Sequence, residues 1–195
     1  GSVGTHDTDR GTGATFLSYL KQGFEHILPE GLDHILFVLG LFLLCRAWKP
    51  TLIQVTTFTA AHTVTLALAT LGYVSAPGHI VEPIIAASIA VIALENIFRP
   101  TYGKFRIILV FVFGLIHGLG FAQRLIDERI PAGSIVSSLL GFNLGVEFGQ
   151  LAVIGLAIAA TFWIKDEEKY RGWVVIPAST LIAVAGLFWA YQRIA

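Results

Sequence analysis

The chain has 195 residues, of which 55% are hydrophobic and only 13% are charged, and its mean hydropathy is +0.74. Soluble domains carry about 25% charged residues, so this composition excludes an ordinary water-soluble protein and predicts an integral membrane protein. The formal net charge is zero, which argues against nucleic acid as a partner. The lone Cys45 excludes an internal disulfide and a cysteine-rich metal site.

Six segments are long and apolar enough to cross a bilayer as helices, which takes about 20 residues each. Their apolar residues do not alternate as the short strands of a membrane barrel do. We therefore predict an all-α bundle in contact with membrane lipid, with residues 13–195 forming a single transmembrane domain. The predicted crossings are 32–48, 51–73, 80–98, 105–124, 134–164 and 173–192.

Two features precede the first crossing. Residues 13–28 carry apolar side chains at helical spacing, which predicts a short amphipathic helix at the membrane interface. Residues 1–12 are polar and glycine-rich, and we interpret them as a disordered tail or an expression remnant. Because the chain contains no methionine, we expect a signal peptide or an N-terminal extracytoplasmic domain to have preceded residue 1.

Basic residues are concentrated in the loops after the first, third and fifth crossings. Of the thirteen lysines and arginines, eight lie there: Arg46, Lys49, Arg99, Lys104, Arg106, Lys165, Lys169 and Arg171. By the positive-inside rule these loops are cytoplasmic and both termini face outward. In a bacterium, this arrangement predicts an inner-membrane protein with periplasmic termini.

Ionisable residues inside the crossings are the strongest functional signal. Each costs about 2.5–3.5 kcal/mol at helix-centre depth, so it needs a partner or a wet cavity. Most of them gather in the outer half and middle of the predicted bundle, where they could form one site. The candidate metal ligands are His26, Asp33, His34, His62, His117 and Glu147, with secondary polar positions at Glu82, Glu95, Asn96, Asn143 and Gln150.

The fifth predicted crossing has two distinct faces. Asn143, Glu147 and Gln150 share one face of the helix. Glycines recur every four residues from Gly141 to Gly149 on nearly the opposite face, and such a stripe lets another helix approach closely. We expect this stripe to pack against another helix of the chain or to be the interface of a homo-oligomer.

Imidazole and carboxylate ligands suit divalent nickel, zinc or cobalt. Three histidines and an aspartate would complete a tetrahedral site, whereas three ligands alone would leave a position open for water or a passing ion. Structural interpretations stand beside this one. His62 could be a hydrogen-bonded core residue, Asp33 a first-turn acid favoured by the helix dipole, and Glu147 with its polar neighbours a contact between helices.

Five blocks of sequence resemble the HupE/UreJ family, in its second branch of membrane domains. In chain order they are HILPEGLDHILFVLGLFLL, FTAAHTVTLALA, VEPIIAASIA, FGLIHGLGFA and FNLGVEFGQL. HupE is regarded as a nickel permease and UreJ as its urease-linked relative, so the resemblance implies passage of a divalent metal ion. It also implies that His26, Asp33 and His34 match the first-helix motif and that His117 matches a His-Gly motif. The paired His-Gly block of the permeases has only one histidine here, so metal binding carries over better than nickel specificity.

These observations predict a nickel-like divalent-metal permease or facilitator. The expected path of the ion passes, from outside to inside, Asp33, His34, His117, His62, Glu147, Glu95 and Asn96. The alternative is an intramembrane zinc-dependent hydrolase of lipid or peptide, with Asp33 or Glu147 as the general base. A third interpretation is a non-catalytic membrane anchor or sensor, whose polar residues only hold helices together.

Overall fold

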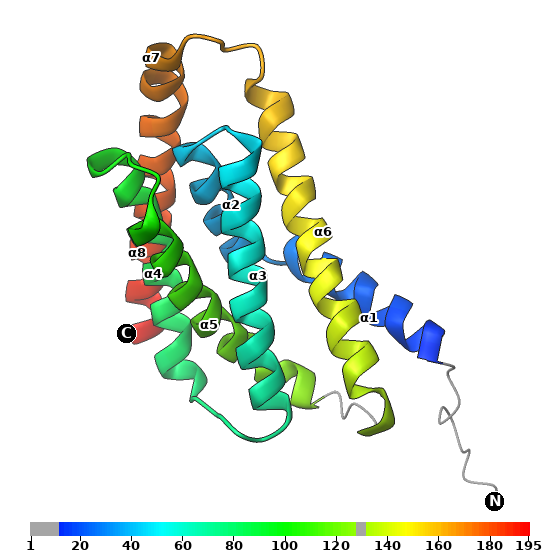
Figure 1. Cartoon of the computed structure of the whole chain (residues 1–195). Helices are drawn as coiled ribbons and strands as arrows, with labels where there is room; N and C mark the ends of the chain where they lie inside the picture. The colour runs from blue at the N-terminus through cyan, green and yellow to red at the C-terminus, as the bar shows by residue number, and fades with distance from the viewer. Residues whose placement is uncertain (1–11, 128–131) are drawn as a thin grey trace, which may run out of the picture.

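The computed structural model describes residues 12–127 and 132–195, and every regular element in these ranges is helical. The long helices are α1 (Thr12–Ile27), α2 (Leu32–Leu44), α3 (Trp48–Thr70), α4 (Gly78–Phe98), α5 (Lys104–Asp127), α6 (Ile135–Thr161) and α8 (Ile176–Ile194), shown in Figure 1. Three short helical pieces are η1 (Ala132–Ser134), α7 (Glu167–Tyr170) and η2 (Arg171–Val175). The predicted all-α class is confirmed.

The structure has five candidate crossings, or six if α1 and α2 together form one bent span, compared with the six predicted. Five helical spans are long and apolar enough to cross a membrane: α3, α4, the apolar part of α5, α6 and the run from α7 through α8. The predicted continuous crossing at 32–48 is shortened to α2, whose 13 residues extend only about 20 Å. A hydrocarbon core is about 30 Å thick. A sixth crossing here needs α1 as its other half, and the two helices meet at a bend of 72°.

Residues 12–27 form the predicted short helix, and one face of it packs along α6. A side chain added at Gly141 would collide with the backbone of Phe16, and one added at Gly145 would collide with the backbone of Leu20. Farther along, a side chain at Gly149 would meet Ile27. The glycine stripe is therefore covered by α1 of the same chain. This corrects the expectation that it could be an interface between protomers.

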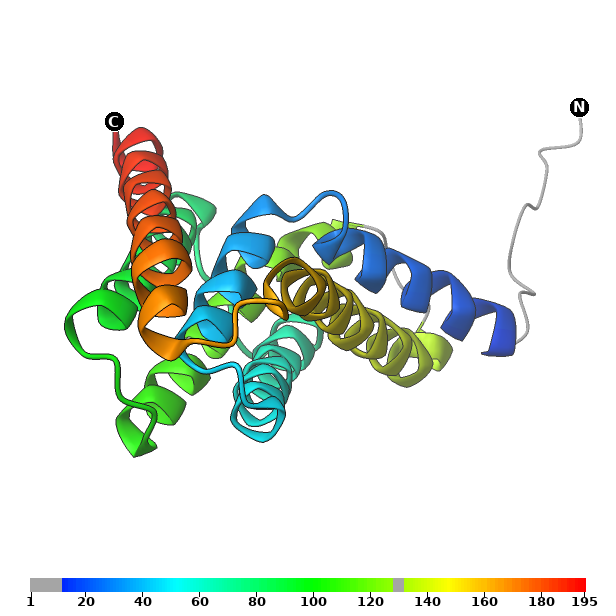
Figure 2. The same ribbon diagram turned by 90° about the horizontal axis from the view of Figure 1, so that it is seen from above.

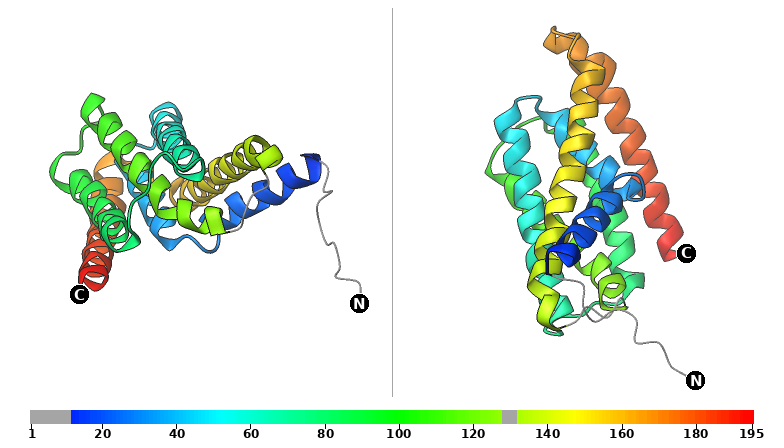
Figure 3. Two further views of the ribbon diagram at one scale, coloured as in Figure 1. Left: turned by 90° about the horizontal axis from the view of Figure 1, so that it is seen from below. Right: turned by 90° about the vertical axis from the view of Figure 1, so that its right-hand side faces the viewer.

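The long helices are arranged as three closely packed pairs around α2. α1 packs with α6, α3 with α5, and α4 with α8, while α2 touches members of all three pairs (Figures 2 and 3). Phe37, Leu41 and Phe42 of α2 are buried in the same core cluster as Phe58 of α3 and Phe142 of α6. The short central helix thus brings side chains from otherwise separate pairs to one place.

The outside of the bundle is strongly apolar. Large hydrophobic side chains such as Val136, Leu156 and Leu181 are each more than 60% exposed. Such surfaces are unfavourable in water and are expected where a protein contacts lipid. Together with the long apolar helices, they identify an integral membrane protein.

Candidate metal centre

The break between α1 and α2 positions the first two histidines. His26 lies in the last turn of α1 and His34 in the first turn of α2. Between them, Pro29 cannot continue the backbone hydrogen-bond pattern of α1. At Gly31 an added Cβ would run into the carbonyl oxygen of His26, so only glycine allows this tight path. The result is an imidazole pair with ring centroids 4.5 Å apart.

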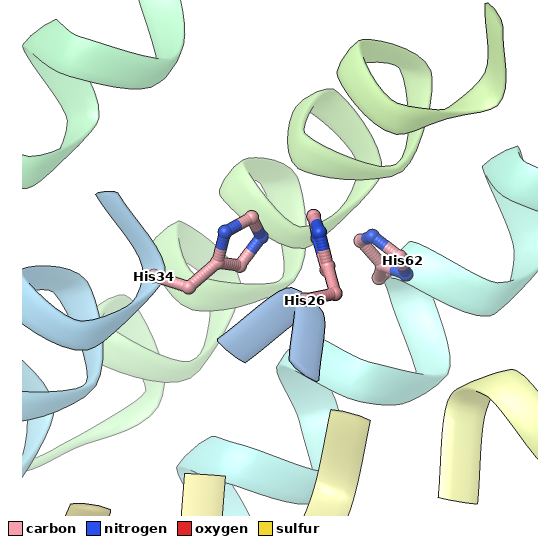
Figure 4. A group of neighbouring side chains, drawn as sticks. All are labelled: His26, His34 and His62. Carbon is pink, nitrogen blue, oxygen red and sulfur yellow. The ribbon is translucent and has the colours of Figure 1, made fainter. Parts of the chain in front are cut away.

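His62 of α3 completes a compact group with these two residues. The potential ligand atoms of His26, His34 and His62 all lie within 4.8 Å of one another. Figure 4 shows the imidazoles gathered from α1, α2 and α3. We call these three residues the histidine triad. Three imidazole nitrogens at such spacing could hold a divalent ion and leave a fourth position open.

The side chain of His62 has an unmet bonding requirement. Its exposed fraction is 0%, and within the described part of the chain its Nε2 atom has no hydrogen-bond partner. The other ring nitrogen, Nδ1, lies 3.5 Å from Oδ1 of Asn143. Leaving a buried polar atom unpaired costs about 1–3 kcal/mol, so a bound ion at Nε2 would remove this cost. Asn143 would then orient the ring from behind.

His117 of α5 lies beside the triad. Its Nδ1 is 3.4 Å from Nε2 of His34, and its Nε2 is 3.0 Å from the hydroxyl of Ser88. Glycine makes this position accessible, because a Cβ at Gly118 would collide with the carbonyl of His62 on α3. His117, also a predicted ligand, therefore contacts His34 but is not one of the three residues whose ligand atoms lie within 4.8 Å of one another.

Aromatic rings surround the imidazoles. Phe58 lies 5.1 Å from His117, and Phe121 lies 4.1 Å from His26, measured between ring centroids. On the α6 side, Phe142 stacks on His62 at 6.4 Å. Such a shell limits access of water to the imidazoles.

A cavity of about 540 Å³ leads to the histidines. Its walls include His26, His34 and His117, together with the acidic side chains of Asp33 and Glu82. Glu30 and Arg193 also line it. Because α4 begins and α8 ends beside this cavity, it opens on the side of the molecule that carries the C-terminus.

Asp33 points to an arginine in this structure. Nη2 of Arg193 donates to Asp33 Oδ2 at 2.8 Å, and Nη1 donates to the backbone oxygen of Glu82 at 3.1 Å. Arg193 therefore joins the N-terminal ends of α2 and α4 across the cavity. Asp33 is next to His34 in sequence, but its carboxylate is engaged at the wall of the cavity.

The polar face of α6 meets α3 along a separate seam. Thr56 donates to Glu147 at 2.8 Å, and Thr59 donates to Gln150 at 3.2 Å. Among the predicted site residues of α6, Asn143 reaches the triad through His62, while Glu147 and Gln150 are held by threonines of α3. The threonine partners explain how α6 can carry these polar side chains at membrane depth.

Glu95 and Asn96, which were also predicted as polar site residues, belong to a buried network near the opposite end of α2. Nη1 of Arg106 donates to Glu95 Oε2 at 2.6 Å, and its Nε donates to Gln54 at 2.9 Å. The carbonyl of Gly40 accepts from both Arg106 and Asn96. Arg106 was predicted to be a loop charge, but this prediction is wrong, because its exposed fraction is 0% and it lies in α5. The signal that could have revealed it is Glu95, an opposite charge at the facing end of the preceding crossing.

Comparison with known proteins identifies the family. The chain belongs to the HupE/UreJ family: the model described as "HupE / UreJ protein" matches residues 4–193. No curated protein and no solved structure matches the chain. The family match and the buried histidines together describe an integral membrane protein with a group that could hold a metal ion.

Proposed function

We propose that this protein is a permease or facilitator for a divalent transition-metal ion, with nickel, zinc and cobalt as candidate substrates. The observation that carries the proposal is the histidine triad, whose ligand atoms lie within 4.8 Å of one another beside a cavity of about 540 Å³. Imidazole is a preferred ligand for these ions. The resemblance to the nickel permeases of the family supports the same class of substrate.

The acidic wall of the cavity suits capture of a cation. Asp33, Glu82 and Glu30 contribute carboxylates, against the single guanidinium of Arg193. A cavity lined mainly by one sign of charge concentrates ions of the opposite sign. The ion would then exchange water ligands for the imidazoles of the triad, and its binding there must remain weak enough for release. On the predicted topology this cavity faces the periplasm, so the proposed direction is inward.

The onward path proposed from the sequence runs along two polar features. Glu147 and Gln150 lie where α6 contacts α3. On the predicted topology this contact extends from the triad toward the inner half of the bundle. The network around Glu95 and Asn96 lies near the C-terminal end of α4, which is the inner end on the predicted topology. Both features place carboxylate and amide groups between the helices of the bundle. They support passage through the bundle over a dead-end site.

The zinc-hydrolase alternative has one observation in its favour and one against it. Three histidines with an open fourth position are also the ligand set of some catalytic zinc sites. A general base must reach the proton it removes at about 2.6–3.2 Å or through one water. Here Asp33 is bound to Arg193 and Glu147 to Thr56, so the two proposed bases are both engaged elsewhere. The anchor or sensor interpretation predicts no metal binding at all.

Uptake of nickel into proteoliposomes tests the proposal. We expect the parent protein to accelerate entry of Ni²⁺ to a trapped fluorescent indicator and His34→Ala to abolish this activity. His79→Ala is the matched control, because His79 is an exposed residue at the start of α4. Equal uptake by the parent and His34→Ala would contradict the proposed path. Absence of uptake with one tightly retained ion per chain would favour the enzyme instead.

A further inference from the structure

A series of hydrogen bonds links His34 to the backbone of α4, and we call it the Ser88 relay. Ser88 donates its hydroxyl proton to the carbonyl of Ile85 at 2.7 Å, and the same oxygen lies 3.0 Å from Nε2 of His117. Nδ1 of His117 lies in turn 3.4 Å from Nε2 of His34. The side chains of Ser88, His117 and His34 are all buried, so bulk water does not compete for these contacts.

The direction of the Ser88 relay fixes the position of two protons. A serine hydroxyl carries one proton and here gives it to a carbonyl, so the oxygen of Ser88 accepts at its contact with His117. In the neutral form that binds metal, His117 therefore carries its proton on Nε2 and its lone pair on Nδ1. This lone pair can only accept, so His34 also carries its proton on Nε2. The lone pair of His34 is left on Nδ1.

The proton of His62 is fixed from another backbone carbonyl. Nδ2 of Asn143 donates to the carbonyl of Leu139 at 2.7 Å, and its Oδ1 lies 3.5 Å from Nδ1 of His62. An amide oxygen can only accept, so His62 carries its proton on Nδ1 and its lone pair on Nε2. This Nε2 is the buried atom that has no hydrogen-bond partner in the described part of the chain. The lone pair of His62 is thus available to an ion.

We propose that Ser88 and Asn143 are positioning residues, which fix the tautomers of His34 and His62 and so preset the lone pairs that bind the ion. This inference rests on the proposed function of the histidine triad as a metal site. An imidazole whose ring is not held can place its proton on either nitrogen, and the hydrogen bond to one nitrogen decides which of them is left for a metal. A site with fixed tautomers is preorganised, so less freedom is lost when the ion binds.

The contact with a second helix distinguishes Ser88 from an ordinary helical serine. A serine that bonds to a carbonyl of the preceding turn is common in helices, and the bond to Ile85 alone would indicate no function. Here the oxygen of the same hydroxyl meets His117 of α5, which contacts a member of the triad. Ser88 itself does not contact His34, so its effect on the ion would be transmitted by His117.

Nuclear magnetic resonance tests the proton positions directly, because protonated ring nitrogens of imidazole and those with a lone pair have different ¹⁵N chemical shifts. The sample is the detergent-purified full chain without metal, labelled with ¹⁵N-histidine. The chain has six histidines, which single substitutions can assign. We expect the proton on Nε2 of His117 and of His34, and on Nδ1 of His62.

Ser88→Ala removes the hydroxyl without adding volume. We expect His117 and His34 to become mixtures of the two tautomers. The Kd for Zn²⁺, measured by isothermal titration, should rise about three- to tenfold, which is less than the usual 10–100-fold effect of a residue that contacts the ligand itself. Ser88→Thr keeps the hydroxyl and should restore both readouts. Ser179→Ala is the matched control, because Ser179 is a buried serine of α8 that contacts no histidine.

Asn143→Leu provides the complementary test. It should release the proton of His62 from Nδ1 and leave the tautomer of His117 as it is in the parent chain. Ser88→Ala should do the reverse and leave His62 unchanged. A general disturbance of the bundle would instead affect both histidines in each variant.

Three results would overturn this inference. They are a proton on Nδ1 of His117 or on Nε2 of His62 in the parent chain, tautomers that neither Ser88→Ala nor Asn143→Leu changes, and an unchanged Kd in Ser88→Ala. Failure of the transport proposal is separate from these outcomes. The expected protons and Kd values without uptake of Ni²⁺ into proteoliposomes would support the positioning residues and contradict transport alone.

Discussion

Nδ1 of His117 lies 3.4 Å from Nε2 of His34, so the two imidazoles contact each other across the α2–α5 interface. Ser88 holds the far nitrogen of His117 at 3.0 Å. This arrangement resembles a ligand oriented by a partner behind it. It predicts that loss of the His34 side chain weakens metal binding more than loss of the His117 side chain does.

We expect His34→Ala to abolish binding of Ni²⁺ at the triad and His117→Ala to weaken it by about 10–100-fold, the usual effect of losing an orienting partner. Isothermal titration of the purified variants measures both. His79→Ala should bind as the parent does. Full affinity in His117→Ala would remove His117 from the site.

The ion pair at the cavity wall predicts a change in metal capture. Arg193→Gln should free the carboxylate of Asp33 and remove one positive charge, so the KM for Ni²⁺ uptake should fall severalfold at low ionic strength. The difference should shrink at about 1 M salt, where the Debye length is about 3 Å. Arg193→Lys keeps the charge and serves as the control. An unchanged KM in Arg193→Gln would show that this pair does not govern capture.

Packing of α1 on α6 predicts a selective loss of stability. Gly145→Val would force the added side chain into the backbone of Leu20, and we expect a destabilisation of about 1–3 kcal/mol, as in other overpacked cores. Gly155→Val is matched to it, because nothing lies within 4 Å of a Cβ at Gly155 in the same helix. Thermal unfolding in detergent compares the two variants. Equal melting temperatures would contradict the observed contact between α1 and α6.

The buried pair of Arg106 and Glu95 predicts strong coupling. Arg106→Gln alone leaves the Glu95 carboxylate buried without its cation, and removing one partner of such a pair typically costs about 3–5 kcal/mol. Adding Glu95→Gln should recover part of that loss. A double-mutant cycle of the free energy of unfolding measures the coupling. Strictly additive effects would show that the two side chains do not interact.

Hydropathy was sufficient to predict the long helices, because a bilayer requires runs of apolar residues that few other structures need. It could not predict that the first crossing is broken. Pro29 and Gly31 indicate an interruption, but the direction of α1 depends on its contact with the glycines of α6, more than a hundred residues away. The sequence shows that α1 has an apolar face and that α6 has a stripe of glycines, but only the fold shows that these two faces meet.

Part of the candidate site could also be predicted from the sequence. Polar residues at membrane depth are costly enough that they stand out, which is why His26, His34 and His62 could be selected from the sequence. Their partners could not be assigned, since Asp33 binds Arg193 and Glu147 binds Thr56 across distances of 160 and 91 residues in the chain. Arg106 was missed because a basic residue near a helix end ordinarily reaches the membrane surface.

The central claim is that three imidazoles hold the ion, and X-ray absorption spectroscopy of the purified chain loaded with one equivalent of Zn²⁺ tests it most directly. We predict scattering from imidazole nitrogens at about 2.0–2.1 Å, and we expect this imidazole scattering to be reduced or lost in each of His26→Ala, His34→Ala and His62→Ala. A first shell of oxygen alone, or a spectrum that none of these substitutions changes, would contradict the claim.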